Sequence, residues 1–119
     1  IIALKPENIK LVKDALMGVV SEGSGTGKAA RSAMVSIGGK TGTSQVIGGD
    51  TGRAGLDARF RDHAWFVAFA PEFNPRIAVA VFAEHGGHGA TAAAPVAKKV
   101  IEAYYRVKAE DQGPQVADH

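Results

Sequence analysis

Four consecutive residues, Lys40-Thr41-Gly42-Thr43, place an ammonium group, two hydroxyls and a glycine side by side. Alternate side chains of a strand point to the same face, so Lys40 and Gly42 are predicted on one face and Thr41 and Thr43 on the other. The missing side chain at Gly42 allows the backbone of a bound ligand to lie close to the strand. Positive charge beside hydroxyl donors favours an anionic ligand, so this segment is a candidate anion-binding site.

Two other interpretations compete with that site. Taken alone, Lys40 on a solvated strand is an ordinary surface charge. Gly39-Lys40-Thr41 also resembles the end of a phosphate-binding loop, but that loop requires a glycine where Met34 stands and a helix directly after the motif. The glycine-rich run of residues 23–28 follows a predicted helix rather than a strand, so it is interpreted as a turn and not as a nucleotide-binding loop.

Helical spacing predicts an element at each end of the chain. Pro6 suits the first turn of a helix over residues 6–21, whose apolar side chains recur every three or four residues until the glycine-rich run ends it. A second helix is predicted over residues 91–108, with Pro95 in its first turn, where a proline is tolerated. The polar residues 110–119 are expected to form a disordered tail.

Three strands are predicted between the helices. The motif lies in a strand over residues 34–47, followed by a long loop over residues 48–62. Residues 64–70 and 76–84 read as an antiparallel hairpin joined by a short turn. Both faces of the segment 76–84 are apolar, so we expect the two helices to cover both. Five aromatic residues are expected to pack in the core or between helices: Trp65, Phe66, Phe69, Tyr104 and Tyr105.

Composition excludes several classes of function. The chain has 119 residues, of which 45% are apolar and 22% charged, so it suits one domain or part of one. Its formal charge of +2, without a dense basic run, does not favour nucleic-acid binding. There is no cysteine for a disulfide or a thiol nucleophile, and no apolar stretch long enough to cross a membrane. The sequence opens on Ile1 rather than methionine, which indicates a piece of a longer protein.

Charged and imidazole side chains outside the motif have less specific interpretations. His63, His85 and His88 raise the possibility of a metal site, but hydrogen-bonded or solvated loop histidines are the simpler interpretation. Arg61 and Asp62, taken by themselves, are interpreted as a surface ion pair of little energetic value.

The segments around the motif occur in the same order, and with similar spacing, as in a known family. They are residues 39–46, 61–63, 68–71, 74–75, 77–81 and 84–87. Together they resemble the C-terminal part of class B penicillin-binding proteins, in particular the penicillin-binding protein 2 branch that serves cell elongation. The resemblance covers residues 6–107.

This resemblance implies peptidoglycan D,D-transpeptidation, in which a serine attacks a stem peptide, expels its terminal D-alanine and passes the acyl group to an amine. It implies that Lys40, Thr41, Gly42 and Thr43 bind the substrate and that Lys40 and Thr43 assist catalysis. Lys40 would supply positive charge, the two threonine hydroxyls would donate to the substrate carboxylate, and the Thr43 N–H would form half of the oxyanion hole. The family's Ser-x-x-Lys and Ser-x-Asn motifs are missing from this sequence. The chain alone is therefore expected to lack the nucleophile and to be inactive.

The resemblance also implies an α+β fold, an antiparallel sheet of about three strands flanked by helices, as part of the penicillin-binding protein and serine β-lactamase fold. Residues 1–109 would form the C-terminal portion of a transpeptidase domain. In the complete fold, two earlier strands pair beside the segment 76–84. That edge is therefore expected to be free here and to permit self-association.

The implied partners are the peptidoglycan stem peptide, β-lactam antibiotics and membrane proteins of the elongation complex, with no cofactor, metal or nucleic acid. The parent protein would lie on the periplasmic side of the bacterial inner membrane. Three alternatives remain open: part of a serine β-lactamase, part of a penicillin-sensing receptor, or a non-catalytic binding module.

Overall fold

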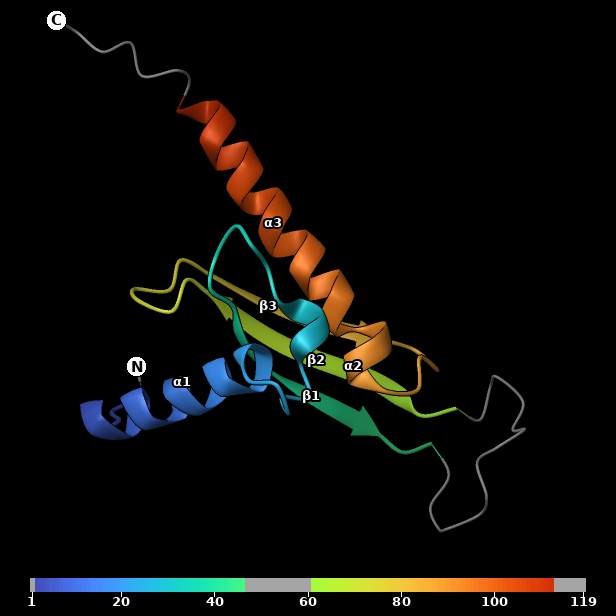
Figure 1. Cartoon of the computed structure of the whole chain (residues 1–119). Coiled ribbons are helices and arrows are strands. Elements are labelled where there is room, and N and C mark those ends of the chain that lie inside the picture. Colours follow the sequence, from blue (N-terminus) through green and yellow to red (C-terminus); the bar gives the residue numbers. More distant parts are fainter. Residues whose placement is uncertain (1, 47–60, 113–119) are drawn as a thin grey trace, which may run out of the picture.

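A computed structural model describes residues 2–46 and 61–112 of the chain (Figure 1). The elements in order are α1 (Pro6–Ser21), the 3-10 helix η1 (Lys28–Ala30), β1 (Gly38–Ser44), β2 (His63–Ala70), β3 (Ile77–Ala83), α2 (Gly89–Ala92) and α3 (Ala94–Asp111). This order confirms the predicted α+β class and the hairpin. Most of the loop predicted over residues 48–62, and the end of the predicted tail, lie outside the described residues.

The three strands form one antiparallel sheet in the order β1-β2-β3, with β2 at the centre. The pairing register places Lys40 opposite Val67 and Gly42 opposite Trp65. Because directly opposed residues share a face of a sheet, these four side chains belong to one face, and the predicted alternation along the motif is confirmed. We call the face that carries Lys40 the open face, and the other the helix face.

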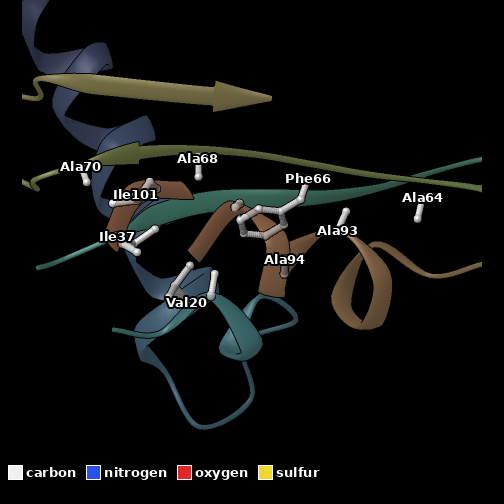
Figure 2. Packing of buried hydrophobic residues seen from close by; sticks show 11 residues of the cluster. Val20, Ile37, Ala64, Phe66, Ala68, Ala70, Ala93, Ala94 and Ile101 are labelled. Carbon is white, nitrogen blue, oxygen red and sulfur yellow. The ribbon is translucent and has the colours of Figure 1, made fainter. Parts of the chain in front are cut away.

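The core lies on the helix face, where side chains of β2 meet α3 and η1 (Figure 2). Phe66 and Ile101 are its largest fully buried side chains. The remaining positions are mostly alanines, from β2 and from the α2–α3 region: Ala64, Ala68, Ala70, Ala93, Ala94 and Ala97. Small residues allow helix and sheet backbones to approach closely, so α3 lies directly over the sheet.

Helix α1 begins with Pro6 in its first turn and ends where Glu22 turns into extended backbone, as the sequence predicted. It packs against β1 and η1 rather than against β3. Its Met17 reaches the start of β1, where a Cβ on Gly38 would lie 2.8 Å from the Met17 sulfur. Helix α1 therefore borders the motif strand.

The prediction that helices cover both faces of β3 is wrong. Helix α3 covers one face, whereas Ala78, Ala80 and Phe82 are exposed on the open face. Trp65, predicted in the core, also lies there and is 39% exposed, with its ring centroid 4.7 Å from that of Phe82. The reason is that α1 lies beside β1, so no described helix covers this part of the open face.

Three further boundaries differ from the predictions. β1 begins at Gly38 rather than at residue 34, because the Ser32 hydroxyl accepts the Met34 N–H and bends the chain there. The last helical segment is divided at Ala93 into α2 and α3, which leaves Pro95 in the first turn of α3. Helix α3 continues to Asp111, past the predicted start of the tail.

Candidate functional site

Lys40 extends from the open face at the exposed edge of the sheet. Its ammonium group donates a hydrogen bond to the carbonyl of Thr41 at 2.9 Å, and its side chain is exposed. Lys40 pairs with Val67 of β2, so its charge lies beside an apolar side chain that is itself 47% exposed. An exposed ammonium above apolar surface is available to an anionic ligand, and its present partner is a neutral carbonyl.

Thr41 points to the helix face, where it meets a residue that the sequence did not single out. The Thr26 and Thr41 hydroxyl oxygens are 3.3 Å apart, within hydrogen-bond distance. Thr26 belongs to the glycine-rich turn after α1, which folds back through a hydrogen bond from the Gly27 N–H to the Val19 carbonyl. The turn therefore places a second hydroxyl at the edge of the motif strand.

Gly42 and Thr43 complete the motif near the end of β1. Gly42 is half-buried, and Thr43 and Ser44 are exposed. Within the described part of the chain, β1 pairs with β2 only, so its other edge is free of strand partners. A free strand edge presents unpaired N–H and C=O groups to an extended peptide. The four motif residues are thus assembled on one accessible strand.

Gly89, the first residue of α2, packs directly against the backbone of the motif strand. A Cβ at Gly89 would lie 2.3 Å from the Trp65 carbonyl oxygen, 3.0 Å from the Gly42 carbonyl oxygen and 3.2 Å from the Gly42 nitrogen. Those distances leave no room for a side chain. Helix α2 is consequently a close support for Gly42.

Asp62 lies just beyond this same end of the motif strand and is only 8% exposed, so it is not part of an exposed surface ion pair. Its carboxylate accepts the Val46 N–H at 3.4 Å, and its carbonyl accepts the Gly87 N–H at 2.9 Å. Asp62 thereby joins the segment after β1 to the loop between β3 and α2.

The histidines near this position are hydrogen-bonded, as the simpler interpretation predicted. The His85 N–H donates to Nδ1 of His63 at 2.9 Å, and Nδ1 of His85 lies 3.0 Å from the Arg61 carbonyl. His88 is exposed at the start of α2. No cluster of three or more histidine or carboxylate side chains suited to a metal occurs among residues 2–46 and 61–112.

A groove of about 500 Å³ lies elsewhere, between α1 and the turn that joins β2 to β3. It is lined by Pro6, Ile9, Lys10, Lys13, Asp14, Glu72 and Phe73. None of the four motif residues contributes to it. The chemistry suggested by the sequence is therefore on the exposed strand and not in this groove.

Comparison with known proteins identifies the family of this chain. Residues 2–102 match the model of the penicillin-binding protein transpeptidase domain. The chain belongs to this transpeptidase family. The predicted family is confirmed, and it accounts for the α+β fold.

Individual members of the transpeptidase family agree with the predicted branch. The chain is 41% identical to the peptidoglycan D,D-transpeptidase MrdA of Haemophilus influenzae over 97 residues, which are 77% of this chain and 15% of that protein. The chain thus spans a small part of this curated relative.

Two solved structures have the same fold. Penicillin-binding protein 2 of Pseudomonas aeruginosa, in complex with WCK 5153, is 42% identical, with a TM-score of 0.70 over 87% of this chain and 21% of that one. Penicillin-binding protein A of Mycobacterium tuberculosis, solved as an imipenem acyl-enzyme, is 31% identical, with a TM-score of 0.62 over 86% of this chain and 20% of that one.

Sequence reasoning missed three neighbours of the motif, namely Thr26, Asp62 as a buried group, and Gly89. Gly89 alone gave a usable signal, because a glycine has no side chain and so permits another part of the chain to approach its backbone closely. Thr26 and Asp62 have partners 15 and 16 residues away in the chain, and no local pattern encodes such contacts.

Proposed function

We propose that this chain supplies the substrate-binding strand of a peptidoglycan D,D-transpeptidase. A serine hydroxyl attacks the penultimate D-alanine carbonyl of a stem peptide, an ester forms, and the terminal D-alanine leaves as an amine that takes up a proton. An amine of a second stem peptide then attacks the ester, an amide forms, and the serine is released. The observation that carries the proposal is Lys40-Thr41-Gly42-Thr43 on an exposed strand of this family's fold.

Each motif residue has a role suited to its position. Lys40, exposed on the open face, attracts the terminal carboxylate of the substrate and places positive charge near the hydroxyls of the serine motifs. The hydroxyls of Thr41 and Thr43 donate to that carboxylate, and Gly42 lets the peptide backbone lie against the strand. The Thr43 N–H stabilises the oxyanion, and removal of one such donor costs about 3 kcal/mol of transition-state stabilisation.

The nucleophilic serine is supplied by residues outside this sequence, because neither Ser-x-x-Lys nor Ser-x-Asn occurs within it. β-Lactams are inhibitors of the same reaction, since they mimic the end of the stem peptide and acylate the serine. The imipenem acyl-enzyme of the Mycobacterium tuberculosis relative supports this class of inhibitor. The names of the relatives favour a transpeptidase over a β-lactamase or a sensor. The strand conformation of the motif also disfavours an unrelated binding module.

The proposal extends to location and partners. We place residues 1–109 in the C-terminal portion of a transpeptidase domain on the periplasmic side of the inner membrane, associated with membrane proteins of the elongation complex. None of the helices in the described part of the chain is long and apolar enough to span a membrane. The free edge of β3 is proposed to allow two copies of this chain to associate.

The test compares Lys40→Ala with Lys99→Ala in the full-length transpeptidase, using the rate of labelling by a fluorescent penicillin. Lys99 is an exposed lysine of α3, away from the motif, and serves as the matched control. Lys40→Ala is expected to slow labelling by about 10²- to 10³-fold because a charge that acts in the transition state is lost. Lys99→Ala is expected to behave as the wild type. Equal rates for both variants, or stoichiometric labelling of the 119-residue chain by itself, would contradict the proposal.

A further inference from the structure

The end of the motif strand needs a support outside the sheet. Among residues 2–46 and 61–112, β1 has a single strand neighbour, and its last residues, Thr43 and Ser44, are exposed. An oxyanion donor is effective only when it is held in place before the reaction, since reorganisation during the reaction would cancel its benefit. The contacts that fix the backbone beyond Thr43 therefore bear on the proposed reaction.

The first support is the buried carboxylate of Asp62. It accepts the N–H of Val46, two residues after β1 ends, and the Asp62 carbonyl accepts the N–H of Gly87 in the loop between β3 and α2. Asp62 is only 8% exposed, and leaving a buried charge without hydrogen bonds is costly, so its carboxylate stays with the groups that surround it. One residue thus connects the segment after β1 to the loop between β3 and α2.

The loop between β3 and α2 is itself fastened to the start of β2. Besides the bond from Gly87, the backbone N–H of His85 donates to His63, and the His85 ring contacts the Arg61 carbonyl. The loop leads directly into Gly89, which lies against the backbone of Gly42. A displacement of Asp62 would therefore reach the motif both through Val46 and through Gly89.

We propose that Asp62 is a positioning residue for the Thr43 N–H, acting with the loop that ends at Gly89. This inference rests on the proposed function, because the end of the strand has to be held in place only if the Thr43 N–H acts as an oxyanion donor. Asp62 does not touch the substrate. It holds the end of the motif strand so that the Thr43 N–H can donate to the oxyanion that forms during acylation.

The test measures acylation of the full-length transpeptidase by a fluorescent penicillin over a range of concentrations, which separates non-covalent affinity from the acylation rate constant. Asp62→Ala is expected to lower the acylation rate constant by roughly tenfold to hundredfold, while the non-covalent affinity changes much less. The reason is that a small misplacement of the Thr43 N–H reduces stabilisation of the transition state. Asp62→Asn is expected to recover most of the rate, since its amide oxygen still accepts the Val46 N–H. An unchanged rate in Asp62→Ala, or an equal loss in Asp62→Asn, would overturn the proposal.

Gly89→Ala tests the same support without removing a buried charge. Its new methyl group would collide with the Trp65 carbonyl and push against Gly42, whereas a Cβ at Gly23 would meet nothing within 4 Å. Gly89→Ala is therefore expected to slow acylation, and Gly23→Ala to leave it unchanged. Hydrogen exchange of residues 38–46, followed by mass spectrometry, should rise in Asp62→Ala and in Gly89→Ala but not in Gly23→Ala.

The outcomes separate the two proposals. A wild-type enzyme that the penicillin does not label would refute the proposed function and with it the role of Asp62 in acylation. A labelled wild type whose Asp62→Ala and Gly89→Ala variants react at the wild-type rate would refute the positioning role alone. Unchanged hydrogen exchange in both variants would likewise refute it.

Discussion

Phe66 shows how single residues set the geometry under the motif strand. Its ring is fully buried on the helix face, and two of the residues against it, Gly27 and Gly39, are glycines. A Cβ at Gly39 would lie 2.6 Å from Phe66 Cζ, and one at Gly27 would lie 3.1 Å from Cε2. The ring therefore fills space that these glycines leave between β1, β2 and the turn after α1.

Phe66→Ala is expected to reduce the free energy of unfolding by about 3–5 kcal/mol, because it removes a large buried ring and leaves a cavity. Urea denaturation followed by circular dichroism measures the change. Phe73→Ala is the matched control, since Phe73 is 80% exposed and its loss should change stability by no more than about 0.5 kcal/mol. Similar effects of the two substitutions would contradict this view of the core.

The sequence predicted which face each motif residue occupies but not what lies around it. Alternation along a strand has a period of two, so Lys40 and Thr41 could be separated from the pattern alone. The hydroxyl of Thr26 and the carboxylate of Asp62 reach the strand through turns of the chain. Such contacts depend on the path of the backbone, which side-chain periodicity does not describe.

At the scale of elements, α3 is tied to the segment that precedes β1. The Ser32 hydroxyl donates to the Glu102 carboxylate at 2.7 Å and also accepts the Met34 N–H at 3.1 Å. Glu102 lies on α3 and is mostly shielded, with 15% of its side chain exposed. This link fixes the approach of the chain to the motif strand.

Ser32→Ala is expected to lower the free energy of unfolding by about 1–3 kcal/mol, because the shielded Glu102 loses the shorter of its hydrogen bonds and the Met34 N–H loses its acceptor. Thermal unfolding of the chain measures the loss. Ser24→Ala, in the exposed turn after α1, is the control and should be near neutral. A loss in Ser24→Ala as large as that in Ser32→Ala would exclude the link as the cause.

Element boundaries were predictable where proline or glycine marks them. Pro6 and the glycine-rich turn gave the ends of α1, and the turn between residues 70 and 77 gave the hairpin. The start of β1 was not predictable, because the hydrogen bond that the Met34 N–H donates to the Ser32 hydroxyl bends residues whose apolar character suits a strand. The break at Ala93 between α2 and α3 lies in a run of alanines, which gives no local sign of a helix end.

At the scale of the molecule, the described elements cover the two faces of the sheet unequally. Helices cover the helix face, whereas Trp65, Val67 and Phe82 on the open face are each at least 39% exposed. The sequence showed that both faces of the segment 76–84 are apolar. It could not tell which partner covers each face, because an apolar side chain packs equally well against any apolar neighbour.

Self-association through β3 is the prediction that belongs to this scale. β3 is an edge strand in the described part of the chain, with small or apolar side chains along it. Such an edge pairs readily with a second copy. Sedimentation velocity over a range of concentrations should show a mass that increases with concentration.

Ala80→Lys should reduce that association, because a charge on an edge strand opposes pairing. Ala103→Lys, on the exposed surface of α3, is the control with the same added charge. A chain that stays monomeric at every concentration, or equal association by both variants, would count against pairing through β3.

Trp65 is the only tryptophan in the chain, and it lies opposite Gly42 on the open face with its ring partly in water. Its emission spectrum is therefore an intrinsic reporter of the polarity beside the motif strand. Any molecule or segment that settles over this strand will move the emission to shorter wavelengths and protect the indole from a soluble quencher. Trp65 is thus an intrinsic fluorescent probe at the place where binding is expected, and no dye has to be attached.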